Sequence, residues 1–374
     1  MPRQNFRVAA AVHINGNLVP ATRWAVDINA YSIASTLEAT VTTATARGFN
    51  KLSDYGQVAQ GSNAKTTPLI PMKFSAGVGT DSAPQLLTIE EGYLDATERS
   101  YDEYSVSFSG RGAASIFQDI QITTPVLKNA AGSAIIASIF AKRGIPLTVA
   151  APSPQYSGKT QDLQTFDQTM RGRTEWDVLQ AISAADGYRL TVHNNQGWYG
   201  PYGQGDPTLS FWWGRAKNGA GIVHMTIRHA PRRTRNIKVV GRSFIPKSNH
   251  AVTASYPPNA GSSEGETFQV AFPPGLKQAV LATQVQAKFY EIAKKEFLLT
   301  ATLVPDAEFL QTVSQYGANF KIQLGGPDVW ASQQLLYEIR QVRLEFDSTS
   351  GGSAPLLAHI IAGNYNPTGE GFVS

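Results

Sequence analysis

The 374-residue sequence predicts a mainly β protein with α+β parts. Apolar and polar residues alternate in short runs in the first and last thirds, and two segments of the middle third have apolar residues at helical spacing. The composition agrees, because 42% apolar and 16% charged residues with 33 Gly and 21 Pro are typical of a folded, loop-rich chain. A chain of this length indicates two to four domains.

The first third predicts antiparallel strands. Alternation from Phe6 to Ile14 ends at Asn15-Gly16, a dipeptide that accepts the positive φ angles of a type I′ hairpin turn. Similar runs cover residues 24–28, 37–41, 70–74, 87–93 and 104–109. Short strands with one apolar and one polar face predict an antiparallel barrel or sandwich. The polar stretch Lys51–Thr67 is expected to be a long surface loop.

The middle third predicts two helices. The segments SAIIASIFAKRG and TEWDVLQAISAADG have helical spacing and end at a glycine suited to the C′ position. Thr174 and Asp177 are spaced as in a capping box. The phrase Gly-x-x-Leu-Thr-Val follows each helix, at residues 144–149 and 187–192, which indicates a repeated helix-to-strand element.

The last third returns to strands, at residues 236–240, 297–304, 320–324 and 337–346. In the last of these the apolar phase shifts, which predicts a β-bulge near Arg340-Gln341. One helix is expected to interrupt this region, because four apolar residues share one face: Leu281, Val285, Phe289 and Ile292.

The absence of cysteine excludes disulfides, thiolate nucleophiles and Cys-ligated metals, and it fits a protein made in a reducing cytosol. The N-terminus lacks the apolar core of a signal peptide, and no segment reaches the roughly 20 apolar residues that span a bilayer. We therefore expect a soluble protein that is not secreted through its own signal.

One hydrolase motif and the end of one nucleotide-binding motif occur, but the flanking residues that each motif requires are missing. Gly261-Ser262-Ser263-Glu264-Gly265 matches G-x-S-x-G, but two prolines precede it and polar residues follow, so a flexible loop is expected. Gly158-Lys159-Thr160 lacks the first glycine and the entering strand of a phosphate loop. No nucleotide and no other cofactor is predicted.

No metal site and no catalytic residue is predicted. The histidines are not spaced as metal ligands, and His224 and His229 are expected on a strand or loop. A polysaccharide hydrolase needs only two carboxylates, so the acidic stretch of Glu90, Glu91, Asp95, Glu98, Asp102 and Glu103 is a candidate. Turns and solvent-facing strand surfaces are the commoner places for such side chains.

The strongest charge asymmetry lies between Asp206 and Glu264, where no acidic residue occurs. A basic face there, beside Trp212-Trp213, fits either nucleic acid or an acidic protein partner. These aromatics, with Trp198, Tyr199 and Tyr202, are otherwise expected to fill core and interfaces. The candidate interface residues are Arg228, Arg232, Arg233, Arg235, Lys238 and Arg242.

The stretch TFDQTMRGRTEWDVLQAISAADGYRLTVHNNQGWYGP, residues 165–201, resembles a segment of phage tail baseplate hub proteins, the late control D and T4 gp27-like family, which is related to the N-terminal part of type VI secretion spike proteins. IEEGYLDATERSYDEYSVSFSGRGAASIFQDI and RRTRNIKVVGRSF are similar to the strands that leave the first barrel and enter the second barrel of that family. In residues 165–201 the family's positions are filled by Gln168, Trp176, Asp177, Leu179, Ile182, Gly187 and Pro201.

The resemblance implies two antiparallel, tail-tube-like β-barrels joined by a smaller α/β region. Residues 1–112 would form the first barrel and 113–221 the helix-strand connecting region. Residues 222–374 would form the second, interrupted barrel, with one helix and a C-terminal tail. No lysozyme or spike extension is expected after Ser374.

The implied function is that of a structural hub and not an enzyme. A homotrimer would present a pseudo-sixfold ring that joins the sixfold tail tube, or a distal tail protein, to the threefold central spike. A tape measure protein would be a further partner, and DNA would only pass through the channel. The chain would lie in the virion, at the tail baseplate or tail tip, after assembly in the host cytoplasm, without inserting into a membrane. The alternatives are an enzyme acting on cell-wall or capsule polysaccharide, and a DNA-binding module.

Overall fold

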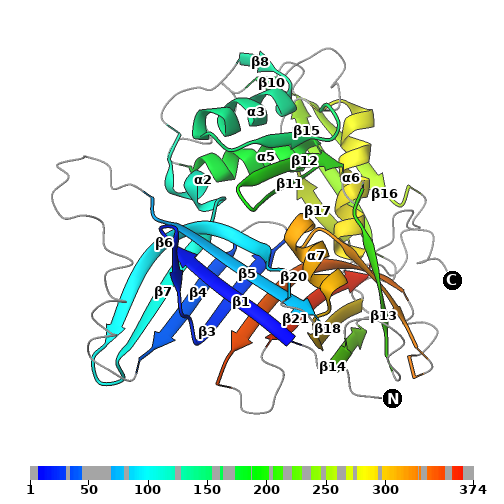
Figure 1. Cartoon of the computed structure of the whole chain (residues 1–374). Helices are drawn as coiled ribbons and strands as arrows, with labels where there is room; N and C mark the ends of the chain where they lie inside the picture. Colours follow the sequence, from blue (N-terminus) through cyan, green and yellow to red (C-terminus); the bar gives the residue numbers. More distant parts are fainter. Residues whose placement is uncertain are drawn as a thin grey trace, which may run out of the picture.

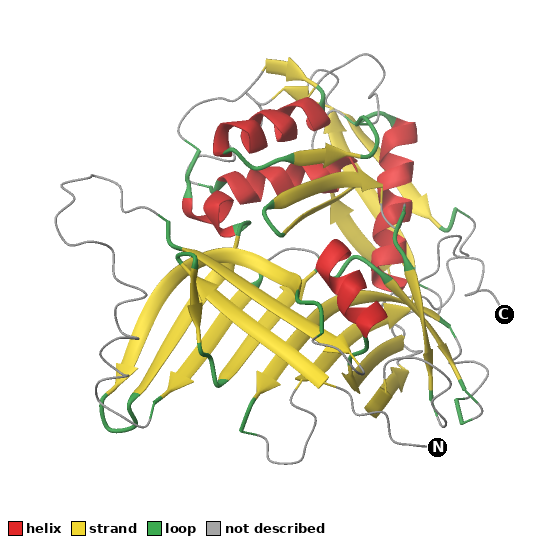
Figure 2. Cartoon of the chain, in the orientation of Figure 1, coloured by secondary structure: helices red, strands yellow, loops and turns green. Residues whose placement is uncertain are grey.

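The computed structural model describes residues 7–30, 34–43, 69–79, 84–122, 128–153, 161–162, 173–186, 188–201, 205–213, 221–229, 237–245, 250–258, 267–272, 276–293, 297–326, 328–329, 335–349 and 356–364. A large sheet forms the lower half of the molecule in the view of Figure 1, and most helices lie above it, as Figure 2 shows. The chain is mainly β with α+β parts, as predicted.

The main sheet has 13 strands and combines both ends of the chain. β3 pairs with β20 over seven residues, so strands of the first and last thirds belong to one sheet. The first third supplies β1 (Arg7–Ile14), β2 (Asn17–Val19), β3 (Arg23–Asn29), β4 (Thr36–Thr42), β5 (Pro71–Gly79), β6 (Leu87–Ser100) and β7 (Ser105–Gly112). The rest are β13 (Thr208–Trp212), β14 (Gly221–His229), β18 (Phe297–Val304), β19 (Lys321–Gly325), β20 (Leu336–Asp347) and β21 (Leu356–Asn364).

Alternation along the strands builds the core of this sheet. On β4, Leu37, Ala39 and Val41 are buried, whereas Glu38 between them is exposed. This period of two is what a strand with one solvated face requires. One continuous apolar cluster, which we call the main core, contains residues of both ends of the chain, such as Phe74 and Leu344.

Two local predictions in the main sheet are confirmed. Asn15 and Gly16 have φ angles of 52° and 77°, and Ile14 pairs directly with Asn17, so a two-residue turn joins β1 to β2. The register of β20 against β21 shifts between Ile339 and Gln341, where a bulge was expected.

The connecting region folds above the sheet as helices with short strands (Figure 1). Its elements are α2 (Ser115–Asp119), β8 (Lys128–Ala130), α3 (Gly132–Arg143), β9 (Leu147–Val149), β10 (Gln161–Asp162), α5 (Glu175–Asp186), β11 (Tyr188–His193) and β12 (Gln196–Pro201). A second apolar cluster, the connecting core, includes Phe117, Phe140 and Trp176.

The predicted end of the first helix, the predicted start of the second and the repeated element are confirmed, whereas the second predicted end, Gly187, lies outside the described residues. α3 ends at Gly144 in the left-handed conformation, with φ 69°. The Thr174 hydroxyl accepts from the Asp177 N–H at 3.2 Å, and the Asp177 carboxylate accepts from the Thr174 N–H at 3.0 Å. β9 and β11, which follow the two helices, flank β12 in one three-stranded sheet.

A smaller unit lies beside the connecting region. β15 (Lys238–Ile245), β16 (His250–Tyr256) and β17 (Thr267–Ala271) form a sheet, and α6 (Gln278–Ala293) covers it. The predicted apolar face of α6 is confirmed, because Leu281, Val285 and Phe289 are buried and Ile292 packs against them.

The expectation of a single helix in the last third is wrong, because α7 (Ala307–Tyr316) is a second one. The Asp306 carboxylate accepts from the Phe309 N–H at 2.8 Å and begins the helix. Phe309, Leu310 and Val313 join the main core, and α7 packs against β5 and β6.

The strand pairings of the described residues close no barrel, so the two barrels and the three domain limits stay predictions. The expected loop at Lys51–Thr67 lies outside the described residues. No described helix has the length and hydropathy that crossing a bilayer requires.

Candidate functional site

The candidate interface residues do not lie on one element. Arg228 is exposed on β14 of the main sheet, whereas Lys238 and Arg242 lie on β15 of the smaller unit. Arg232, Arg233 and Arg235 lie outside the described residues. Their shared role as an interface therefore stays a prediction.

The acidic stretch divides into residues with different environments. Asp95 receives two hydrogen bonds from Arg111, at 2.7 and 3.1 Å, and Glu98, Asp102 and Glu103 are exposed. Glu90 is buried, with 1% of its surface exposed, so the expectation of a turn or solvent-facing position is wrong for this residue.

Glu90 and Asp102 do not form a hydrolase pair. Ten residues of β6 separate Glu90 from Ser100, which at about 3.3 Å per residue places the two carboxylates roughly 30 Å apart. Glycosidase carboxylates stand no more than about 10 Å apart. Glu90 and Asp102 therefore cannot act together in polysaccharide hydrolysis.

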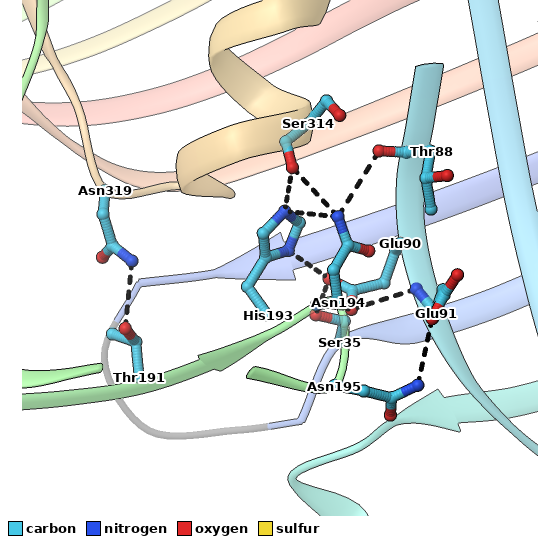
Figure 3. A network of polar contacts seen from close by, with 10 residues as sticks. All are labelled: Ser35, Thr88, Glu90, Glu91, Thr191, His193, Asn194, Asn195, Ser314 and Asn319. Atoms are coloured by element: carbon cyan, nitrogen blue, oxygen red, sulfur yellow. Dashed lines mark hydrogen bonds and ion pairs between the residues drawn. The ribbon is translucent and has the colours of Figure 1, made fainter. Parts of the chain in front are cut away.

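Glu90 instead belongs to a buried polar junction, which we define as Ser35, Glu90, His193, Asn194 and the carbonyl of Ser314 (Figure 3). One Glu90 oxygen accepts from the Ser35 hydroxyl at 3.0 Å and from His193 Nδ1 at 2.8 Å. The other oxygen accepts from the N–H groups of Asn194, at 3.2 Å, and Glu91, at 3.3 Å. Four donors satisfy the ionised carboxylate in a place that water does not reach.

The turn between β11 and β12 positions the other half of the junction. Asn194 and Asn195 have φ angles of 48° and 57°, the left-handed pair that a two-residue hairpin turn needs and that Asn tolerates. Asn194 Nδ2 donates to the Ser314 carbonyl at 2.9 Å, and Asn195 Nδ2 donates to Glu91 at 3.1 Å. The turn thus contacts β6 and α7 at once, as Figure 3 shows.

His193 lies between two acceptors. Its Nδ1 faces Glu90, and its Nε2 lies 3.0 Å from the Ser314 carbonyl and 3.1 Å from Asn194 Nδ2. Burial of the imidazole lowers its pKa, but the charge and hydrogen bond of Glu90 and the α7 backbone outweigh this, and the pKa of His193 is raised. The charged imidazolium satisfies both acceptors.

The junction is not a nucleophilic site, although it contains Ser, His and Glu. A catalytic serine contacts the histidine nitrogen remote from the acid, so that this nitrogen can take its proton. Here the Ser35 hydroxyl donates to Glu90, and the remote nitrogen faces a backbone carbonyl. The arrangement holds three parts of the chain together and activates no group.

Two buried carboxylates, Asp186 and Asp206, accept hydrogen bonds from side chains of the connecting region. Arg189 donates to Asp206 at 2.6 and 2.9 Å, and both side chains are 4% exposed. Asp186 accepts from Ser153, at 2.7 Å, and from Tyr199. Burial and the Asp186 charge raise the pKa of Tyr199. The Asp186 contacts brace the region internally, whereas the Arg189–Asp206 pair joins β11 to the residues just before β13 of the main sheet.

The other motifs add no site. The G-x-S-x-G and Gly-Lys-Thr motifs lie outside the described residues. His224 and His229 lie on a strand, β14. Of the aromatic residues, Tyr199 is buried and Trp212 is half exposed. In the described part of the chain, no three His, Asp or Glu side chains gather as metal ligands would.

The sequence matches no protein-family model and no curated protein. Its structure is similar to that of the tail protein from Neisseria meningitidis MC58, with TM-score 0.68 and 12% identity over 96% of both chains. The 43 kDa tail protein of prophage MuSo2 from Shewanella oneidensis gives TM-score 0.63 and 13% identity, over 95% of this chain and 98% of that one.

A third similar structure is an E. coli protein that is a component of the type VI secretion system and exhibits structural similarity to the T4 bacteriophage tail proteins gp27 and gp5. It gives TM-score 0.51 and 9% identity, over 95% of this chain and 77% of that one. At these identities the likeness establishes the fold alone. The chain therefore has the fold of phage tail proteins, and its resemblance to the gp27-like family is confirmed at the level of the fold.

Proposed function

We propose that this chain is a structural hub of a phage tail baseplate or tail tip. The observation that supports this most is the likeness to two tail proteins over nearly the full length of each chain. A partial likeness would fit a shared module on a different protein, whereas this one includes the main sheet, the connecting region and the smaller unit together.

In this proposal residues 1–112 and 222–374 form two similar barrels, and residues 113–221 brace them. Three chains build a pseudo-sixfold ring that meets the sixfold tube, or a distal tail protein, on one side and the threefold spike on the other. The tape measure protein is a further partner, and DNA passes through the channel. The chain resides in the virion tail. Arg228, Lys238 and Arg242 face a neighbouring chain, the tube or the spike.

A non-enzymatic role follows from the same reasoning. The buried junction holds its histidine between two acceptors, and Glu90 and Asp102 lie too far apart to act as a hydrolytic pair. Cell-wall hydrolysis then belongs to other polypeptides of the particle.

The test combines assembly in solution with a deletion. Native mass spectrometry of the purified chain is expected to give a species of three times 40.4 kDa, and electron microscopy is expected to show rings with a central channel. Particles without the gene are expected to lack assembled tails. Normal-length, fully assembled tails in the deletion mutant would refute the proposal.

A further inference from the structure

The β11–β12 turn attaches the connecting region to the α7 side of the main sheet through polar groups. The main core and the connecting core have no residue in common. Near α7 the hydrogen bonds between the two parts include those of the junction and that from Asn319 Nδ2 to Thr191 Oγ1, at 3.1 Å. Attachment at this side therefore includes contacts that depend on the protonation state of His193.

His193 can make both of its main contacts only when it carries two ring protons. The Glu90 carboxylate and the Ser314 carbonyl both accept, and a neutral imidazole has one N–H. Loss of the Nδ1 proton therefore removes the donation to Glu90. Loss of the Nε2 proton removes the donation to the Ser314 carbonyl of α7 and leaves that nitrogen to accept from Asn194 Nδ2.

The junction pairs one carboxylate, Glu90, with one imidazolium, protonated His193. Among the described groups that face His193, β6 contributes Glu90, the β11–β12 turn contributes the Asn194 amide, and α7 contributes backbone carbonyls. The Ser35 hydroxyl contacts Glu90. Glu91 points to Lys73, at 3.2 Å, and to Asn195, at 3.1 Å. A neutral His193 would leave the buried Glu90 anion without its cation, which is costly.

The ring fits against α7 because residue 317 has no side chain. Gly317 has φ 60°, and a Cβ there would lie 3.0 Å from His193 Cγ. The imidazole therefore fills a defined space at the end of α7.

We propose that the junction is a proton-dependent latch: protonated His193 holds the β11–β12 turn against β6 and α7, and loss of that proton frees the turn while the main sheet stays folded. This device does not depend on the hub role. Since the pKa of His193 is raised above its usual value of 6.5, the stabilisation is complete below pH 6.5. It is lost as the pH rises through the folded-state pKa.

Hydrogen exchange of the full chain, followed by mass spectrometry at pH 6 and pH 9 and corrected for intrinsic rates, tests this. Protection of residues 188–201 is expected to fall at pH 9, because the stabilisation by protonated His193 is lost as the pH rises through its raised pKa. Protection of residues 336–347 is expected to stay constant. Equal protection of residues 188–201 at both pH values would overturn the latch.

Two variants identify the group. His193→Gln is expected to remove the pH dependence, whereas His224→Gln, which changes an exposed histidine on β14, is expected to behave as the wild type. If His193→Gln does not fold, the pH dependence of hydrogen exchange is measured on Glu90→Gln instead. It removes a cause of the raised pKa, so the midpoint of the opening transition is expected to move to lower pH. An unchanged midpoint refutes the proposal.

Discussion

The buried pair Arg189–Asp206 offers a sharp test of how the connecting region is stabilised. Asp206→Ala would leave the Arg189 guanidinium, 4% exposed and 4.7 Å from the centre of the Trp198 ring, without its carboxylate. Breaking a buried ion pair costs about 3–5 kcal/mol, which at about 2 kcal/mol/M lowers a urea midpoint by roughly 2 M. Tryptophan fluorescence in urea measures the shift.

Two further variants separate charge from packing. The double variant Arg189→Met/Asp206→Leu is expected to recover most of the loss, because an apolar pair of similar volume removes the uncompensated charge. The control is Arg23→Ala, which breaks a pair of 3.1 Å whose side chains are 64% and 38% exposed, with an expected cost of about 0–1 kcal/mol. If Asp206→Ala costs no more than this control, the reasoning from burial is refuted.

Three other outcomes are expected. Thr174→Ala removes the cap of α5 and should cost about 1 kcal/mol in urea unfolding, whereas an unchanged midpoint would show that the capping box adds nothing. Gly144→Ala should cost about 1–2 kcal/mol from its left-handed backbone alone, because no atom lies within 4 Å of the added Cβ; a gain in melting temperature would contradict this. The purified chain should release no reducing sugar from cell-wall or capsule polysaccharide, and release that Glu90→Gln or Asp102→Asn abolishes would restore the enzyme alternative.

Local features of the fold could be predicted from the sequence because their causes are local. The Asn15-Gly16 turn, the Gly144 helix end and the bulge near Gln341 each depend on a few adjacent residues. α7 was also within reach, since Asp306 and Gly317 mark its two ends. Its ten residues lie between two strong strand patterns, which hide the shorter helical signal.

Long-range pairing was not accessible in this way. Glu90 and His193 are 103 residues apart, and each looks like a surface residue in its own segment. Nothing around Glu90 in the sequence reveals that β11 and α7 will cover it. Likewise, alternation predicts that β3 and β20 are strands but not that they are neighbours, because pairing depends on the path of the intervening chain.

The pairing of β3 with β20 has a consequence for how the chain folds during synthesis. Gln341 on β20 donates to Asp27 on β3, and 314 residues separate the two. The edge of β3 that pairs with β20 therefore has no partner until the ribosome has made nearly the whole protein. The connecting region, whose core lies almost entirely within residues 113–199, can fold much earlier. Until β20 emerges, the strands of the first third expose an unpaired edge, and we expect premature termination before residue 336 to yield aggregating fragments.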